Sequence, residues 1–177
     1  MNRLLTWVSL NDVQLLQFVH QQLRCRLLDF TLPKITHLGG ATFTLSSLFL
    51  IIILSSSPIK LLAFQALLSL TLSHVVVHII KKIYSRERPY KKLANIVLSS
   101  HPLRDYSFPS GHTTAAFSTI VVFALHSFVL AAFLLPLASL IGFSRMYLGL
   151  HYPTDCMIGA MLGSISAFTI VYFVPFF

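Results

Sequence analysis

Charged residues are scarce in this sequence of 177 residues: Asp, Glu, Lys and Arg make up 10% of it, against about 25% in an ordinary soluble domain. So few charges would not cover the surface of a soluble protein of this size, so we expect a bilayer as its solvent. Acidic residues are the rarer sign, with five against 13 basic residues. The resulting net charge of +8 favours anionic lipid headgroups or an anionic substrate. We expect no nucleic-acid partner, because the basic residues lie between hydrophobic segments.

Cysteines are few, and clusters of acidic residues are lacking. Cys25 and Cys156 are far apart, fit no metal-binding spacing and predict no disulfide framework. No cluster of carboxylates is present to hold Mg²⁺. His74 and His78 have a spacing that can bind a metal, but no third ligand is near, so polar packing or a pathway lining is favoured. The first 16 residues lack the features of a cleaved secretory signal, so we expect a mature start.

Long hydrophobic runs are abundant. A helix needs about 20 mostly apolar residues to cross the hydrocarbon core of a bilayer. We predict an all-α, integral-membrane bundle of about five transmembrane helices, which forms a single domain over residues 41–177. The small residues of the last helix, Gly159, Ala160 and Gly163, favour close helix packing. The five predicted spans are 41–57, 59–80, 111–128, 129–148 and 154–174.

Residues 1–40 have a different pattern, with apolar residues interleaved with Gln, His and Arg over 11–30. This mixture predicts an amphipathic helix in an N-terminal interfacial segment, and a helix packed on the bundle is the alternative. Residues 81–110 form one long polar connection, and connections of that length are usually functional or disordered.

The basic residues gather on one side of the predicted bundle. If the spans alternate, the side that holds the 81–110 connection carries every Lys and Arg except Lys60. The positive-inside rule places that side in the cytoplasm. Basic residues at an anion site can distort this rule, so an exterior face stays open. We predict a multi-pass protein of the cell membrane with its chemistry on this one face.

Three polar clusters lie on that face, and the first two begin and end the long connection. Residues 81–89 place several cations where the chain leaves the second span, although a basic loop that only sets topology would have the same pattern. In the second cluster, Ser110 is a favoured N-cap residue, and the backbone N–H groups of a helix start can bind an anion. Gly111 lets a ligand approach the backbone, and His112 stands where it could donate a proton. A plain helix cap is the alternative.

The third cluster covers residues 144–155. Pro153 suits the first turn of the last helix, which places His151 just before that helix and Asp155 in its first turn. A carboxylate beside an imidazole can fix its tautomer and activate it. With Arg145, the clusters supply cations for a phosphoryl transition state, one histidine to attack phosphorus and another to protonate the departing oxygen.

The clusters resemble the three-part signature of the type 2 phosphatidic-acid phosphatase superfamily, which includes lipid phosphate phosphatases, bacterial undecaprenyl-diphosphate phosphatases and soluble vanadium haloperoxidases. The signature is Lys-x6-Arg-Pro, Pro-Ser-Gly-His and Ser-Arg-x5-His-x3-Asp. All three parts occur in order and without a substitution. Many bacterial members have six spans, whereas this chain has five predicted ones. The matching residues are Lys81, Arg88, Pro89, Pro109, Ser110, Gly111, His112, Ser144, Arg145, His151 and Asp155.

The resemblance implies that His151 is the nucleophile and forms a phosphohistidine, that Asp155 orients it, and that His112 is the general acid for the leaving group. It implies an enzyme that needs no metal or other cofactor. The groups implied to bind the phosphate oxygens are Lys81, Arg88, Arg145, Ser110 and the Gly111 amide.

Two other functions are alternatives to a lipid phosphatase. A transporter would line a pathway with polar groups, but here these groups lie at one interface. A catalytically idle relative would only bind lipid, but His112, His151 and Asp155 are intact. The expected partners are membrane lipids and a lipid phosphate or diphosphate, with no obligate protein partner. The candidate substrates are undecaprenyl diphosphate, phosphatidylglycerophosphate and phosphatidic acid, and the bacterial plasma membrane is the expected location.

Overall fold

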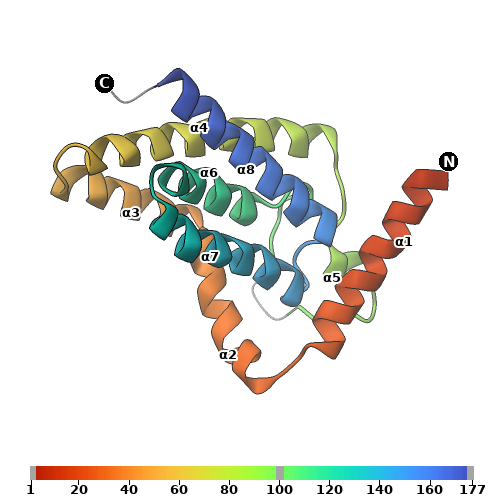
Figure 1. Cartoon of the computed structure of the whole chain (residues 1–177). Coiled ribbons are helices and arrows are strands. Elements are labelled where there is room, and N and C mark those ends of the chain that lie inside the picture. Colours follow the sequence, from red (N-terminus) through yellow and green to blue (C-terminus); the bar gives the residue numbers. More distant parts are fainter. Residues whose placement is uncertain (1–2, 99–101, 175–177) are drawn as a thin grey trace.

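The computed structural model describes residues 3–98 and 102–174, and within these ranges every regular element is a helix (Figure 1). The all-α prediction is therefore confirmed. Two short elements of other helical type, η1 (Phe18–Gln22) and η2 (Thr36–Gly39), follow the first two α-helices. The α-helices are α1 (Arg3–Gln17), α2 (Arg26–Ile35), α3 (Ala41–Leu54), α4 (Ile59–Ile83), α5 (Pro89–Lys92), α6 (Gly111–His126), α7 (Phe128–Tyr147) and α8 (Pro153–Phe173).

The five predicted spans correspond to α3, α4, α6, α7 and α8. Within the described residues, α4, α7 and α8 are long and apolar enough to cross a membrane. A fourth span is possible if residues 26–54 are counted as one, because two helical segments within them meet at a bend of 58°. α6 has 16 residues, fewer than the roughly 20 that a perpendicular span needs. The bundle is therefore that of a membrane protein, with three or four spans by length and composition.

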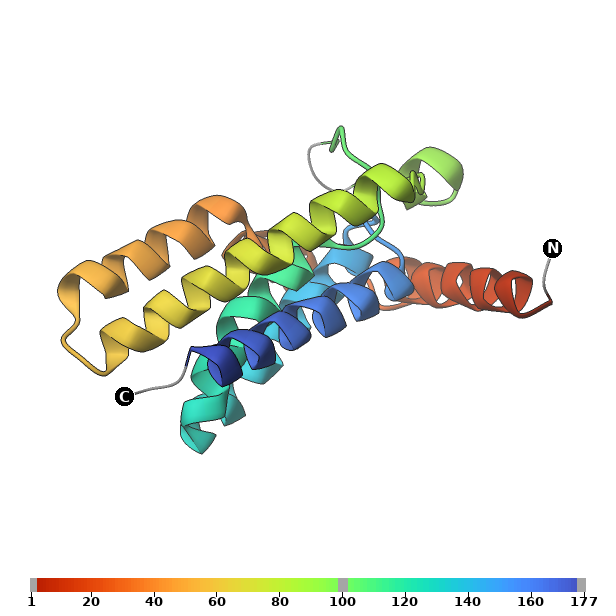
Figure 2. The same cartoon turned by 90° about the horizontal axis from the view of Figure 1, so that it is seen from above.

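Helix α6 lies at the centre of the bundle, where it contacts α3, α4, α7 and α8 (Figure 2). Its contact with α8 is close because two glycines of α8 face it. A Cβ atom at Gly163 would lie 2.5 Å from the carbonyl oxygen of Thr114, and one at Gly159 would lie 2.8 Å from that of Ser110. Ala160 is only partly buried. This packing fixes the start of α6 against the start of α8.

Local sequence signals set where these helices begin. The buried Ser110 side chain caps α6 and accepts from the Thr113 N–H, and Ser127 caps α7 in the same way. α8 begins with Pro153, whose missing N–H costs nothing in the first turn. Between α7 and α8, Gly149 has a φ of +72°, a left-handed conformation that suits glycine.

The N-terminal segment differs from the single amphipathic helix predicted over 11–30. The chain forms α1 and η1, then breaks, and resumes as α2 after Cys25, which has an extended backbone. No Gly or Pro marks this break. The Tyr147 hydroxyl lies 3.4 Å from the Cys25 N–H and donates to Asp29 at 3.0 Å, so a contact distant in sequence stabilises the break. α1 extends away from the bundle (Figure 1).

We expect Gly163→Ala to destabilise the protein, because the new Cβ would overlap the α6 backbone. Overpacking of this kind costs about 1–3 kcal/mol. The melting temperature Tm in detergent should therefore fall. Gly111→Ala is the matched control, because a Cβ there meets nothing within 4 Å. An equal Tm for the two variants would contradict this account of the α6–α8 contact.

Candidate active site

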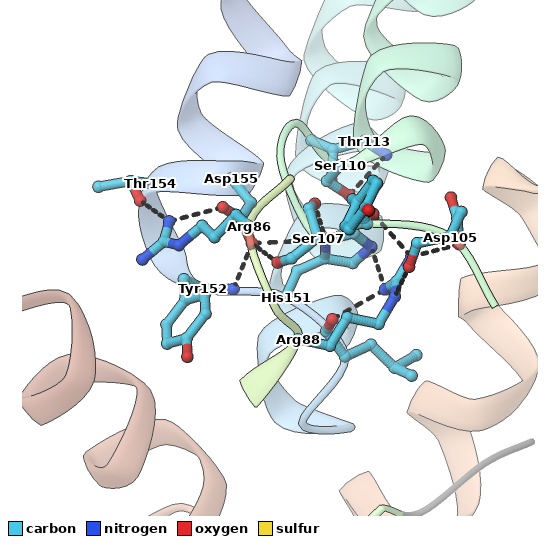
Figure 3. Close-up of polar contacts among 12 residues, drawn as sticks. Arg86, Arg88, Asp105, Ser107, Ser110, Thr113, His151, Tyr152, Thr154 and Asp155 are labelled. Carbon is cyan, nitrogen blue, oxygen red and sulfur yellow. Dashed lines mark hydrogen bonds and ion pairs between the residues drawn. The ribbon is translucent and has the colours of Figure 1, made fainter. Parts of the chain in front are cut away.

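The predicted site residues gather at one end of the bundle, where α4 ends and where α6 and α8 begin (Figure 3). Two connections that flank α5 bring further polar groups to the same place. The site is therefore assembled from segments far apart in sequence around the buried ring of His151.

His151 lies in the turn between α7 and α8 and is 1% exposed. Its Nδ1 lies 2.8 Å from the Ser107 carbonyl oxygen, and its Nε2 lies 3.1 Å from Nη1 of Arg88. A guanidinium can only donate, so Nε2 accepts and Nδ1 carries the proton that it donates to Ser107. This tautomer leaves the lone pair on Nε2, which is the atom able to attack an electrophile.

Asp155 is fully buried in the first turn of α8 and makes several contacts. Its Oδ2 accepts from the Tyr152 N–H at 2.8 Å and from the Ser107 hydroxyl, and its Oδ1 accepts from Nη1 of Arg86 at 2.7 Å. Its Oδ2 is 3.6 Å from His151 Nδ1, which is within ion-pair range but too long for a hydrogen bond. The connection of Asp155 to His151 therefore runs mainly through Ser107.

Arg88 is 1% exposed and is the main connector of the site. Its Nη1 donates to the Leu150 carbonyl at 2.9 Å as well as to His151. Its Nε donates to the Asp105 carbonyl at 2.9 Å, and its Nη2 donates to the Asp105 carboxylate at 2.7 Å. Arg88 thus joins the loop that precedes α6 to the turn that carries the imidazole.

Lys81 and Arg88 share one carboxylate, that of Asp105. Lys81 donates to Oδ2 of Asp105 and, at 3.1 Å, to the Tyr106 carbonyl. Burial alone would raise the pKa of Asp105, but the hydrogen bond and charge of Lys81, together with Arg88, lower it to about 2. The Asp105 carboxylate thus already pairs with Lys81 and Arg88, two of the cations that the sequence predicts to bind phosphate.

The start of α6 offers backbone donors. The N–H of Ser110 donates to the Asp155 carbonyl at 3.0 Å, which joins the starts of α6 and α8. The first N–H groups of an α-helix have no acceptor within the helix, so those that follow Ser110 can bind an anion. The side of Gly111 where a Cβ would stand is open. The approach of a ligand to the Gly111 backbone stays a prediction.

His112 and Arg145 both lie against the turn at residues 36–40. A Cβ at Gly40 would lie 3.6 Å from Nε2 of His112. Arg145 is 3% exposed, and its Nη1 donates to the Thr36 hydroxyl at 2.7 Å. Its Nε has no hydrogen-bond partner among the described residues. A buried guanidinium N–H without an acceptor is costly, and a phosphate oxygen is a suitable acceptor.

A groove of about 660 Å³ lies along α3 and α4 and ends at Lys81, Asp105 and the start of α6. Lys81, Asp105 and Gly111 line it at the polar end, and His74 and His78 lie further along α4. The described residues contain no group of three or more His, Cys, Asp or Glu side chains placed to hold a metal ion. The apolar part of the lining includes Ala41, Leu45, Leu70, Val75 and Val77.

Sequence reasoning missed four residues that contact the predicted ones. Asp105 could have been noticed as one of only five acidic residues, and Arg86 as a cation within the first motif. Ser107 acts partly through its backbone carbonyl, which leaves no signal in the sequence. Thr36 is joined to Arg145 across 109 positions, and no local pattern marks it.

Burial lowers the pKa of His151 to about 3, the charges of Arg145 and Arg88 act in the same direction, and Asp155 opposes them. A histidine with a lowered folded-state pKa gives stability that is lost as pH falls from about 6.5, its unfolded value, toward about 3. We therefore expect stability to decline with acid over this window, by roughly 1.4 kcal/mol per pH unit from this residue. A His151→Gln variant should show a shallower decline of Tm with pH, and an unchanged slope would contradict a neutral buried imidazole.

We expect Asp105→Asn to bind inorganic phosphate or vanadate more tightly than the wild type. The native carboxylate occupies Lys81 and Arg88, and an amide is a weaker competitor for cations. A dissociation constant lowered about threefold or more, measured from the rise of Tm with ligand, is the expected result. Weaker binding by the variant would mean that Asp105 mainly orients these cations.

A model of the PAP2 superfamily matches residues 62–177 of this chain. Among its relatives, the bacitracin transport permease protein BcrC of Bacillus licheniformis is 32% identical over 118 residues, which are 66% of this chain and 57% of that protein. The undecaprenyl-diphosphatase BcrC of Bacillus subtilis is 32% identical over 102 residues, 58% of this chain and 50% of that protein. The chain spans about half the length of these relatives.

Two crystal structures have the same fold. LpxE of Aquifex aeolicus superposes with a TM-score of 0.82 at 28% identity, covering 90% of this chain and 94% of that one. The first transmembrane PAP2 type phosphatidylglycerolphosphate phosphatase from Bacillus subtilis superposes with a TM-score of 0.81 at 25% identity, covering 94% and 86%. With a family model that matches well over half of its residues and all three motifs gathered at one site, this protein belongs to the PAP2 superfamily.

Proposed function

We propose that this protein is a membrane-embedded lipid phosphatase that forms a phosphohistidine on Nε2 of His151. The observation that carries the proposal is the groove. One end is lined by Lys81 and by Gly111 at the start of α6, which suit a phosphoryl group, and most of the rest is apolar and suits a hydrocarbon tail. A lipid phosphate is the class of substrate that matches both ends.

In the first step, Arg88 gives up its contact with His151 and donates to a phosphoryl oxygen. The freed Nε2 lone pair attacks phosphorus, and the bond from phosphorus to the lipid oxygen breaks. His112 donates its proton to that departing oxygen. The imidazolium that forms on His151 keeps its Nδ1–H bond to the Ser107 carbonyl, with the Asp155 carboxylate 3.6 Å away to stabilise its charge.

In the second step, water attacks the phosphorus of the phosphohistidine. His112, now neutral, accepts a proton from that water, the P–N bond breaks and inorganic phosphate leaves. The electron pair returns to Nε2, which restores the resting tautomer. In both steps, Lys81, Arg88, Arg145 and the Gly111 amide stabilise the charge on the phosphoryl oxygens, with Ser110 capping the helix that presents this amide.

The substrate is a phosphomonoester or diphosphate of a lipid with a long apolar tail. One relative is named as an undecaprenyl-diphosphatase and one structural neighbour as a phosphatidylglycerolphosphate phosphatase, and both support this class. The bacterial sources of these proteins support a location in a bacterial plasma membrane. The groove along α3 and α4 would let the tail remain in the bilayer while the phosphate reaches the site.

Transport is the second candidate function, because one relative is named as a transport permease. A transporter needs polar groups along a path through the bundle. Here most of them are gathered at one end, where they hold a histidine in a nucleophilic tautomer. This arrangement favours catalysis.

The test is phosphate release from lipid phosphates by the purified protein in detergent with EDTA present. We expect release by the wild type and a loss of at least 1,000-fold in His151→Ala, because the nucleophile is removed. We expect His112→Ala to lose 100-fold to 10,000-fold, the usual range for general acid–base catalysis, while it still binds vanadate. A panel of undecaprenyl diphosphate, phosphatidylglycerophosphate and phosphatidic acid would rank the substrates.

His126→Ala is the control for these variants, because His126 lies at the opposite end of α6 and its Nδ1 contacts the Val122 carbonyl. It should keep wild-type activity. Equal release by His151→Ala and the wild type, or no release by the wild type from any lipid of the panel, would refute the proposed function.

A further inference from the structure

Asp12 is a buried carboxylate outside the three motifs. It lies in α1 and is 4% exposed, although most of that helix faces outward. The N–H of Thr154 donates to its Oδ1 at 2.9 Å, and the hydroxyl of Thr154 donates to its Oδ2 at 2.6 Å. Asp12 therefore caps the start of α8 from a segment 142 positions away in the sequence.

Asp12 also binds the guanidinium that holds Asp155. Its Oδ2 lies 2.6 Å from Nη2 of Arg86, while Nη1 of Arg86 donates to Oδ1 of Asp155 at 2.7 Å. Nη1 also donates to the Thr154 hydroxyl, and the guanidinium lies over the ring of Tyr152, 3.8 Å from its centre (Figure 3). One cation is thus fixed between two carboxylates, one from α1 and one from α8.

The electrostatics of Arg86 agree with this double pairing. Burial by itself would lower the pKa of Arg86, but the charges of Asp155 and Asp12 outweigh it and raise the pKa. Breaking one side of such a pair leaves the other partners with uncompensated charge and free donors. Without the Asp12 carboxylate, Nη2 of Arg86 would be free to turn toward Asp155, to which Nη1 already donates.

The position of Asp155 matters for the imidazole. Its Oδ2 holds the Ser107 hydroxyl and the Tyr152 N–H, and the carbonyl of the same Ser107 accepts the Nδ1 proton of His151. If Arg86 engaged both oxygens of Asp155, it would compete for Oδ2 with these two donors. The Ser107 carbonyl would then lose the support that fixes the tautomer.

We propose that Asp12 is a positioning residue for catalysis, which orients Arg86 so that Asp155 and Ser107 hold His151 in its nucleophilic tautomer. The N-terminal segment is therefore part of the active enzyme. This inference rests on the proposed phosphatase function, because its readout is turnover.

The alternative is a purely structural role, in which Asp12 only anchors α1 to the bundle. α1 contacts α8, and its outward face carries exposed apolar residues such as Trp7 and Leu10, so an anchor on its inner face would be reasonable. An anchor predicts a loss of stability with little effect on turnover by the folded protein. A positioning residue predicts a loss of turnover in protein that is folded and binds substrate normally.

The test is Asp12→Asn, which removes the charge, keeps the size and retains an oxygen for the Thr154 N–H. We expect kcat to fall at least tenfold while KM stays within twofold of the wild type. Asp29→Asn is the matched control, since Asp29 is the other acidic residue of the N-terminal segment and pairs with Arg24 and Tyr147. It should keep the wild-type kcat.

A double-mutant cycle shows whether Asp12 acts through Arg86. If it does, Asp12→Asn combined with Arg86→Gln should lose no more kcat than Arg86→Gln alone. The inference would be overturned if the kcat losses of the two single variants multiply in the double variant, or if Asp12→Asn keeps the wild-type kcat. If Asp12→Asn does not fold, Arg86→Lys replaces it, because a lysine keeps the charge but lacks the fork that binds two carboxylates.

The outcomes separate the inference from the function on which it rests. If the wild type releases no phosphate from any lipid, the proposed function fails and the inference falls with it. If the wild type is active and folded Asp12→Asn, or Arg86→Lys in its place, keeps the wild-type kcat, only the inference fails.

Discussion

The burial of a guanidinium beside an imidazole is the constraint on which the rest of the site depends. Arg88 is almost inaccessible to solvent, and each of its three nitrogens therefore needs an acceptor within the protein. The carbonyls of Asp105 and Leu150, the Asp105 carboxylate and His151 Nε2 meet that need. Because Arg88 only donates, this arrangement also dictates which nitrogen of His151 has the lone pair. One solvation requirement therefore fixes the tautomer of the proposed nucleophile.

The helix packing keeps this arrangement in place. α6 is central, and glycines of α8 allow the two backbones to approach closely enough for the Ser110 N–H to reach the Asp155 carbonyl. The left-handed Gly149 ends α7 and turns the chain toward His151. The cap of α6 and the turn that carries the imidazole are thus parts of one rigid end of the bundle. The proposed chemistry needs such rigidity, because phosphoryl transfer depends mainly on positioning and electrostatics.

The carboxylates have more varied roles than a simple acid–histidine pair. Asp155 reaches the imidazole chiefly through Ser107, Asp105 occupies cations proposed to bind phosphate, and Asp12 shares Arg86 with Asp155. Four of the five acidic residues of the chain, these three and Asp29, are paired with basic residues. Asp12, Asp105 and Asp155 neutralise buried or partly buried cations, whereas the pair of Asp29 with Arg24 is exposed.

The sequence alone determined the positions of the five core helices, because apolar runs bounded by Ser, Gly and Pro are local signals. It also identified the motif residues, because fixed spacings at helix ends can be recognised without coordinates. Only the tertiary structure decided the break after η1, the acceptor of the His151 proton, the bridge made by Asp105 and the contact of Asp12 with Thr154. These features depend on hydrogen bonds between segments as much as 142 positions apart, and the pairing of buried polar groups is settled only when the helices pack.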